Sequence, residues 1–83
     1  PDAESALRSW ITSIKNVQFD NFAELRRRWP SADQVGRLTV FNIKGNHYRL
    51  IVRIDYEHNK VFIRHFLTHA DYDKNEWKND SWF

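Results

Sequence analysis

The hydrophobic period of the chain changes once, and this change limits the folds available to it. Up to about Arg28, apolar residues recur at intervals of three and four, the spacing of one face of an α-helix. From Arg37, apolar and polar residues alternate, as in β-strands with one buried face. The sequence therefore predicts an α+β fold in which helices are followed by a sheet.

Two helices are predicted in the first part of the chain. The first covers about 1–17, and the second covers about 21–28 with Asp20 as its N-cap. The second helix ends before Pro30, because the residue preceding a proline is pushed out of helical geometry. Residues 30–36 are expected to form a loop.

Three strands and a short C-terminal segment follow. Two hairpin-length connections join the strands, so we expect an antiparallel meander with the helices packed on one face. After about Ala70 we expect a short helix or turn at the end of the sheet. The predicted strands are Leu38–Ile43, His47–Tyr56 and Val61–Leu67.

The second strand shows how the two faces of the sheet divide, because successive side chains point to opposite faces. One set is apolar and aromatic and suits a core beneath the helices: Tyr48, Leu50, Val52, Ile54 and Tyr56. The other set is expected on a face that no segment obviously covers: His47, Arg49, Ile51, Arg53 and Asp55.

Composition excludes several classes of protein. The 83 residues suit one small domain covering 1–83, and 16% of them are aromatic, which helps so short a chain to bury a core. There is no cysteine, so neither disulfides nor a thiolate metal site is available. No apolar run approaches the length of a membrane span, and we expect no membrane partner.

Charge is unevenly distributed along the chain. The formal net charge is +2, but residues 26–64 hold nine Lys/Arg against three Asp/Glu. A basic middle between acidic flanks is typical of proteins that bind a phosphate-rich partner. The alternative is an ordinary solvated charged surface.

Basic side chains are predicted to gather on the uncovered face. Arg49 and Arg53 lie four residues apart on one strand, about 13 Å by strand rise, with Arg64 on the next strand and Lys44 in the adjoining turn. Arginine forks match phosphate oxygens, which favours binding of an RNA backbone. The alternative is that they form surface ion pairs with strand carboxylates such as Asp55.

Among the four histidines, His69 is the candidate for acid–base chemistry, because it ends the third strand where the sheet opens to solvent. His65 and His69 have no third ligand nearby, so no metal site and no cofactor are predicted. The residues alone indicate a nucleic-acid binder and leave open whether it is also a nuclease.

The run at residues 41–77 resembles the C-terminal half of HigB-type toxins, within the RelE-like superfamily of mRNA interferases. The upstream run at residues 29–33 resembles the helix-to-sheet junction of the same family. The matching elements are Phe41-Asn42, Gly45-Asn46, Tyr48-Arg49-Leu50, Ile63-Arg64, Thr68-His69 and Tyr72-Asp73.

This resemblance implies a RelE-like fold and a cytoplasmic bacterial endoribonuclease. It also implies mRNA as the substrate, cut on the translating ribosome by many family members and as free RNA by some, and a HigA-type antitoxin as the protein partner. Such toxins normally begin with a β-strand before their first helix. This chain opens at the helix, so we expect the usual first strand to be absent from it.

The resemblance also implies roles for site residues. Metal-free RNA cleavage uses the 2′-OH as the nucleophile, and it needs a base, an acid and cations for the charge that develops on phosphorus. Arg49 and Arg64 are expected to clamp the phosphate. His69 is expected to be the acid or the base, with Tyr72 as its alternative or as a platform for base stacking.

Other residues are expected to hold RNA or to position the site. Arg53 and Lys44 are assigned to RNA binding. Asn42 and Asn46 match the family motif, but they can equally build the turn, and Asp73 is expected to cap the tail turn or orient His69. Two alternatives stay open, namely a non-catalytic RNA-binding module and a domain that docks a partner protein.

Overall fold

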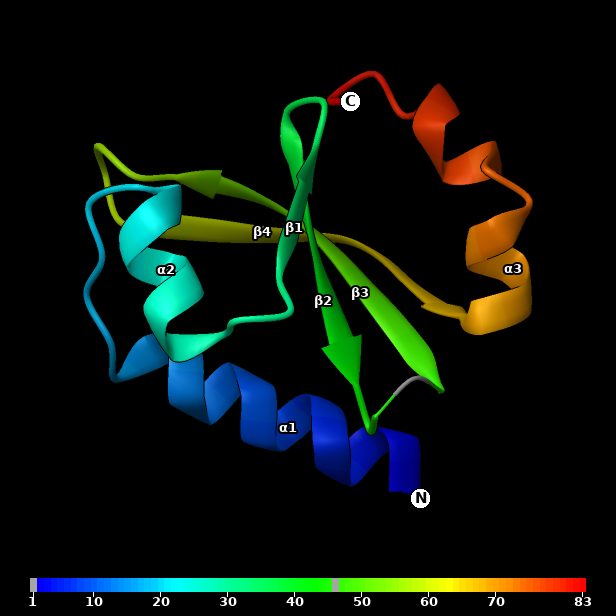
Figure 1. Ribbon diagram of the computed structural model, residues 1–83, viewed down its shortest axis with the longest axis horizontal. Helices are drawn as coiled ribbons and strands as arrows, with labels where there is room; N and C mark the ends of the chain where they lie inside the picture. The colour runs from blue at the N-terminus through cyan, green and yellow to red at the C-terminus, as the bar shows by residue number, and fades with distance from the viewer. Residues whose placement is uncertain (1, 46) are drawn as a thin grey trace.

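The computed structural model describes residues 2–45 and 47–83 and is shown in Figure 1. It is an α+β fold, as predicted, with two helices ahead of an antiparallel sheet and short helices after it. The elements are α1 Asp2–Lys15, α2 Phe22–Arg28, β1 Asp33–Val35, β2 Leu38–Ile43, β3 Tyr48–Asp55, β4 Lys60–Thr68, α3 His69–Asp73 and the 3-10 helix η1 Glu76–Asn79.

The N-cap of α2 is one residue later than predicted. Asn21, and not Asp20, has the extended backbone of a cap, with φ −159° and ψ 174°. Its side-chain oxygen accepts a hydrogen bond from the Glu24 backbone N–H at 2.9 Å, which satisfies one of the free donors of the first turn. Either side chain can cap a helix, so sequence alone did not separate the two positions.

The segment predicted as a loop contains an additional strand, so the prediction for residues 30–36 is wrong at its end. β1 pairs antiparallel with β2, and the four strands follow in the order β1-β2-β3-β4. The two strands are joined across Gly36 and Arg37, and Gly36 has φ +61°, which a residue without a Cβ adopts easily. A three-residue strand is too short to show an alternation in the sequence.

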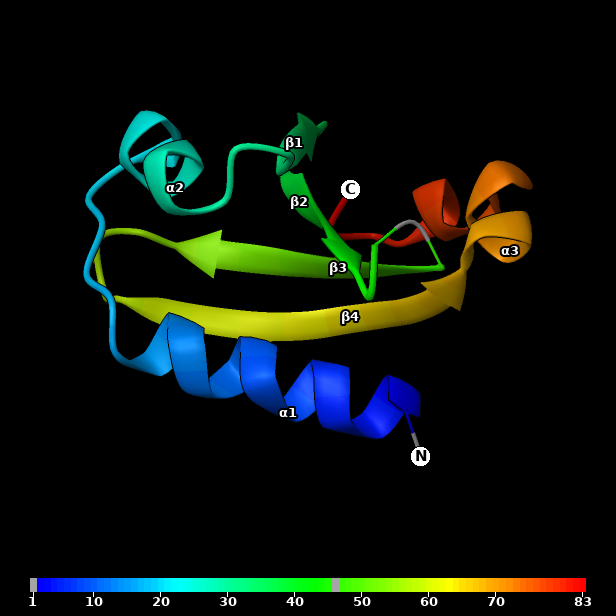
Figure 2. The ribbon, with the colours of Figure 1, turned by 60° about the horizontal axis from the view of Figure 1, so that its bottom comes forward.

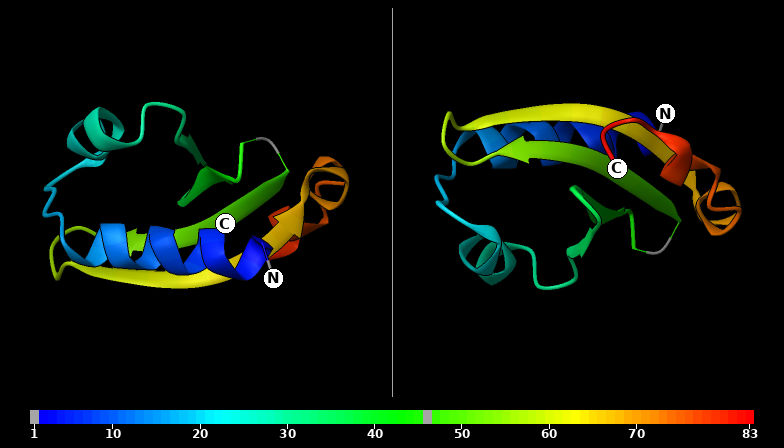
Figure 3. Two further views of the ribbon diagram at one scale, coloured as in Figure 1. Left: turned by 90° about the horizontal axis from the view of Figure 1, so that it is seen from below. Right: turned by 90° about the horizontal axis from the view of Figure 1, so that it is seen from above.

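The first face of the sheet, which we call the helix face, packs against α1 and α2 as predicted. Leu50, Val52 and Ile54 of β3 are buried there, together with Trp10 of α1 and Leu25 of α2. Helix α1 runs alongside β4 (Figure 2), and the view from below in Figure 3 shows the same helix in front of β4.

A continuous aromatic cluster joins the elements of this core. Trp10 meets Phe41 with ring centroids 4.9 Å apart, and Phe41 meets Trp29 at 5.7 Å. Trp29 meets Phe19 at 6.3 Å, and Phe19 meets Tyr56 at 5.9 Å. All four contacts are edge-to-face, the favourable arrangement for aromatic quadrupoles. The cluster thus connects α1, β2, the residues on either side of α2 and the residue that follows β3.

The opposite face of the sheet is not open, and this prediction is wrong. Residues 69–83, which we call the tail, fold across it, and Trp77 packs on Leu38, Val40 and Ile51. Trp77 is 3% exposed and Ile51 is fully buried. We call this the tail face. Because the tail covers its middle, the basic residues that were predicted to lie together on this face are separated. The tail begins with α3 and η1, so the expected short C-terminal helix is confirmed.

Candidate active site

Strand register brings several predicted site residues to one end of the tail face. Asn42 of β2 is paired with Arg49 of β3, and Arg49 is paired in turn with Leu67 near the end of β4. The chain then enters α3, where the His69 backbone N–H donates to the His47 carbonyl at 3.1 Å. This end lies on the opposite side of the molecule from α2 (Figures 1 and 2).

Arg49 and Tyr72 form the centre of this group. The Arg49 guanidinium carbon lies 5.5 Å from the centroid of the Tyr72 ring, and its Nη1 donates to the Tyr48 carbonyl at 3.2 Å. Tyr72 is itself stacked on Trp77, with centroids 5.3 Å apart and an interplanar angle of 14°. The tail therefore fixes the ring against which the arginine rests.

The environment of Tyr72 favours its protonated form. Burial raises the pKa of Tyr72 above its usual value of 10.0, and the nearby negative charge of Asp33 acts in the same direction. The positive charge of Arg49 opposes this shift as a smaller effect. Because the pKa lies above 10, the phenol is protonated at neutral pH, and Tyr72 can donate a proton but is not a ready base.

His69 is the first residue of α3 and is held by an acid one turn later. Its Nδ1 lies 3.1 Å from Asp73 Oδ2, and both side chains are at least half exposed. Thr68 caps the helix by accepting a hydrogen bond from the Asp71 backbone N–H at 3.2 Å. The contact agrees with the expected orienting role of Asp73, and it leaves the opposite nitrogen of His69 free of hydrogen bonds to any described residue.

The remaining predicted RNA-binding residues are distributed between this end and other positions. Lys44 is exposed in the β2–β3 turn, where it has φ +53°, and Asn42 is exposed on β2. Asn46 lies outside the described residues. Arg53 lies four residues farther along β3, paired with Phe62, at the other end of the tail face.

Arg64 does not join Arg49, because β4 is irregular at this point. Ile51 pairs with His65 but Val52 pairs with Ile63, which makes Arg64 an extra residue on β4. A β-bulge of this kind re-aims side chains, so that Arg64 and His65, although adjacent, both reach the tail.

Both residues bind one carboxylate of the tail that the sequence analysis missed. Arg64 donates to Asp80 through Nε at 2.8 Å and Nη2 at 2.9 Å, and His65 Nε2 lies 2.9 Å from Asp80 Oδ2. The Asp80 side chain is only 3% exposed. The Arg64 hydrogen bonds, followed by the Trp82 backbone N–H, hold the pKa of Asp80 well below its usual value of 3.8.

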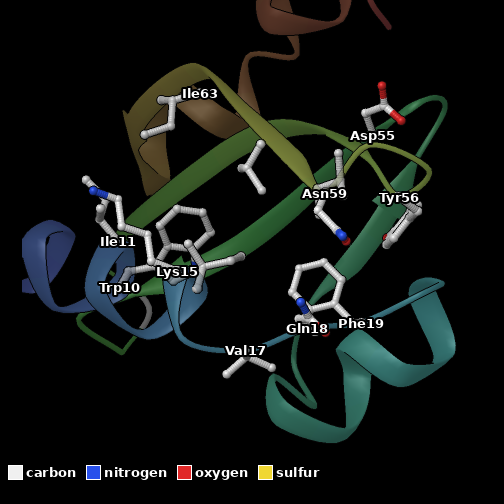
Figure 4. A pocket seen from close by; sticks show the side chains of 13 residues that line it. Trp10, Ile11, Lys15, Val17, Gln18, Phe19, Asp55, Tyr56, Asn59 and Ile63 are labelled. Carbon is white, nitrogen blue, oxygen red and sulfur yellow. The ribbon is translucent and has the colours of Figure 1, made fainter.

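A separate apolar groove of about 500 Å³ lies between α1 and the β3–β4 hairpin (Figure 4). Trp10, Phe19 and Ile63 are among its lining residues, and the only charged ones are Lys15 and Asp55. It lies on the helix face and holds none of the predicted site residues.

Two kinds of feature are absent from the described part of the chain. Within residues 2–45 and 47–83, no group of three or more His, Asp or Glu side chains is arranged to hold a metal ion. No helix in the same part of the chain is long and apolar enough to cross a membrane.

Comparison with known proteins identifies the family. A family model described as a RelE-like toxic component of a toxin–antitoxin system matches residues 3–75. The chain therefore belongs to the HigB toxin family.

Curated relatives agree with this assignment. The chain is 31% identical over 77 residues to the mRNA interferase HigB of Escherichia coli O6:H1, an alignment that covers 89% of this chain and 75% of that protein. It is 30% identical over 76 residues to the mRNA interferase toxin HigB of Escherichia coli K12 and to the mRNA interferase HigB of Shigella flexneri, covering 88% of this chain and 73% of each relative.

Proposed function

We propose that this chain is the toxin of a toxin–antitoxin pair and an endoribonuclease that cleaves mRNA by attack of a ribose 2′-OH on the adjacent phosphate. One observation supports this most directly. Arg49 against Tyr72, and His69 against Asp73, come together at one end of the sheet in a chain of the HigB family. This group offers a cation, a protonated phenol and an imidazole, the set that metal-free RNA cleavage needs.

The proposed reaction assigns one role to each of three side chains. His69, oriented by Asp73, accepts the proton of the 2′-OH through the ring nitrogen that Asp73 leaves free. The 2′-oxygen then bonds to phosphorus and the bond from phosphorus to the 5′-oxygen breaks, giving a 2′,3′-cyclic phosphate. Tyr72 gives its proton to the departing 5′-oxygen, so atoms and charge balance without a metal ion.

Arg49 is proposed to stabilise the charge that develops on the phosphate oxygens. A guanidinium fork matches two of those oxygens, and electrostatic stabilisation of this kind is commonly the largest contribution to catalysis. Arg64 is less suited to this role than the sequence predicted, because the Nε and Nη2 edge of its guanidinium already engages Asp80. We therefore assign Arg64 to holding the tail that positions Tyr72.

The family also supports a wider proposal. Its description as the toxic component of a toxin–antitoxin system supports a neutralising antitoxin of HigA type as the protein partner. The relatives' names, mRNA interferases, support mRNA as the substrate, and we propose that cleavage takes place in the bacterial cytoplasm. We propose that Lys44 and Asn42, both exposed beside the site, contact the RNA backbone. Cleavage on the translating ribosome is part of the same proposal.

The experiment induces the chain in bacteria and maps transcript 5′ ends by primer extension. Wild type should arrest growth and produce new 5′ ends inside coding regions, whereas Arg49→Ala and His69→Ala should abolish both effects. Arg8→Ala is the control, because Arg8 is exposed on α1 and, among the described residues, forms an ion pair with Glu4 alone. Each variant is purified and melted, so that loss of activity is separated from loss of folding.

The outcomes separate the proposed function from the alternatives. If transcripts stay intact and the purified protein still retards RNA on a gel, the chain is an RNA-binding module and the nuclease proposal is wrong. If it neither cuts nor retards RNA, the domain docks a protein partner.

A further inference from the structure

A second cleft lies on the tail face, at the opposite end from His69. It has a volume of about 530 Å³ and opens between the β3–β4 hairpin and the end of the tail. We call it the tail cleft. Its lining residues are Arg37, Arg53, Ile54, Asp55, Tyr56, Phe62, Ser81 and Trp82.

Two arginines and one aspartate line the tail cleft, so its charged side chains carry a net positive charge. Arg53 makes no hydrogen bond or ion pair with any described residue. Among the described residues, Arg37 donates to the main-chain oxygens of Ser81 at 3.2 Å and Phe83 at 3.4 Å, which fix its guanidinium in place. The one carboxylate in the lining, Asp55, is already engaged with His58 Nδ1 at 2.9 Å. The cleft therefore favours an anion.

An aromatic surface borders the same charges. Phe62 is directly paired with Arg53 across the strands and remains 41% exposed, one of two large hydrophobic side chains in that state among the described residues. Its ring lies edge-to-face with Trp82, with centroids 5.5 Å apart. The Arg64 guanidinium lies 4.0 Å from the Trp82 centroid and so holds the indole in place. An exposed ring beside two guanidinium groups, one of which has no hydrogen bond to a described residue, is a combination suited to a base and its phosphate.

We infer that the tail cleft is a subsite for one nucleotide of single-stranded RNA, whose base stacks on Phe62 and whose phosphate lies between Arg37 and Arg53. This inference rests on the proposed function and adds to it. Arg53 lies about 13 Å from Arg49 along β3, so the subsite takes a nucleotide beyond the one whose phosphate is cleaved. The tail, which crosses the face between the two arginines, separates the two sites.

A simpler role for these aromatics is to seat the tail on the sheet. In that case Phe62 matters for stability alone, and Arg53 matters for neither stability nor RNA. The two roles give different results, because stacking and phosphate contacts change RNA affinity and its salt dependence, whereas tail seating changes the melting temperature.

The test uses fluorescence anisotropy to measure RNA binding across a range of salt concentrations. The probe is a fluorescein-labelled RNA hexanucleotide with 2′-O-methyl groups, which cannot be cleaved through the 2′-oxygen. Phe62→Ala should weaken binding about tenfold, the order expected for one lost base stack, with an unchanged salt slope. Arg53→Gln should weaken binding and reduce the salt slope by about one phosphate contact. Arg8→Gln, with the same change of charge on α1, should bind as wild type does.

Two results would overturn the subsite. One is an affinity for the hexanucleotide that is the same in Arg53→Gln, in Phe62→Leu and in wild type. Phe62→Leu is included because it keeps an apolar side chain and so remains informative if Phe62→Ala does not fold. The other is a wild type that does not bind the hexanucleotide at all. Cleavage assays separate this inference from the proposed function. If the wild type binds RNA through Phe62 and Arg53 but cleaves none, the subsite stands and the proposed nuclease function is wrong. If the wild type and both variants cleave RNA with the same KM, the nuclease function stands and the subsite is wrong.

Discussion

Arg64 and Asp80 form a two-pronged ion pair, with Nε to Oδ2 at 2.8 Å and Nη2 to Oδ1 at 2.9 Å. The pair joins an extra residue of β4 to a tail position 16 residues later, and His65 binds the same carboxylate. Since the tail also carries Tyr72, this contact links the bulge in the sheet to the geometry of the candidate active site.

The first prediction concerns acid stability. The folded-state pKa of Asp80 is depressed below its usual 3.8, so the stability that its contacts contribute is fully present above that value and is lost as the pH falls through the folded-state pKa. Asp80→Asn should therefore lower the melting temperature at pH 7. The gap between wild type and variant should be present from pH 7 down to about pH 5 and should narrow below about pH 4.

Melting curves between pH 7 and pH 2 test this prediction. The pKa of Asp55 is lowered in the same direction by its contacts with His58, but that contribution is shared by wild type and variant and cancels in the difference. A gap that does not depend on pH would show that Asp80 stabilises the fold through packing rather than charge.

The second prediction compares the two glycines with positive φ. Gly36 has φ +61°, and a Cβ placed there would lie 2.8 Å from the Phe83 carbonyl oxygen and 3.1 Å from its ring. Gly45 has φ +64° and open space around it. Gly45→Ala should cost about 1–2 kcal/mol for the left-handed backbone. Gly36→Ala should cost about 1–3 kcal/mol more, because the end of the tail must move.

Chemical denaturation of both variants checks this difference. Gly36→Ala should also release the hydrogen bond from the Arg37 backbone N–H to Phe83, 2.8 Å long in the wild type, and thus increase exchange of that amide. Equal losses of stability in the two variants would mean that Phe83 does not rest against Gly36 in solution.

Most of the sheet and both main helices could be predicted, because each carries a repeated pattern. The alternation through Leu50, Val52 and Ile54 correctly identified the helix face. The strand β1 could not be predicted, because three residues are too few for a pattern. The bulge at Arg64 could not be predicted either, because one inserted residue breaks the alternation without leaving a signature of its own.

The tail shows the main limit of local pattern reading. Trp77 and Trp82 lie in short irregular segments, so nothing in their spacing shows that they pack on a sheet formed much earlier in the chain. Asp80 was missed for the same reason. Arg49 and His69 were candidates from their strand positions, whereas Tyr72 was added by the family resemblance, and the structure places all three at one end of the sheet.

The third prediction tests how strongly the tail depends on its anchor. Trp77 is 3% exposed, packs on Ile51 and donates from Nε1 to the Tyr72 carbonyl at 3.1 Å. Trp77→Ala should destabilise the protein by about 3–5 kcal/mol, enough to unfold much of so small a domain. Trp77→Phe keeps most of the apolar area and should cost much less, as measured by urea titration. A small loss in the alanine variant would mean that the tail is not part of the cooperative fold.

The last prediction isolates the proposed acid. Tyr72→Phe removes one hydroxyl but keeps the ring stacked on Trp77 and beneath Arg49, so the melting temperature should stay near wild type. If Tyr72 protonates the departing 5′-oxygen, kcat for RNA cleavage should fall by about 10²–10⁴-fold with little change in KM. Tyr48→Phe is the matched control, because Tyr48 stacks on Phe66 with the same kind of contact but on the helix face.

A leaving group that no longer needs protonation gives the decisive measurement. An RNA substrate with a 5′-thio link at the cleaved bond has a good leaving group, so Tyr72→Phe should cleave it nearly as fast as wild type does, whereas His69→Ala should stay impaired. Equal impairment of Tyr72→Phe on both substrates would assign the hydroxyl to binding the phosphate. In that case the proton for the 5′-oxygen would have to come from another group, and His69, protonated once it has accepted the 2′-OH proton, is the candidate.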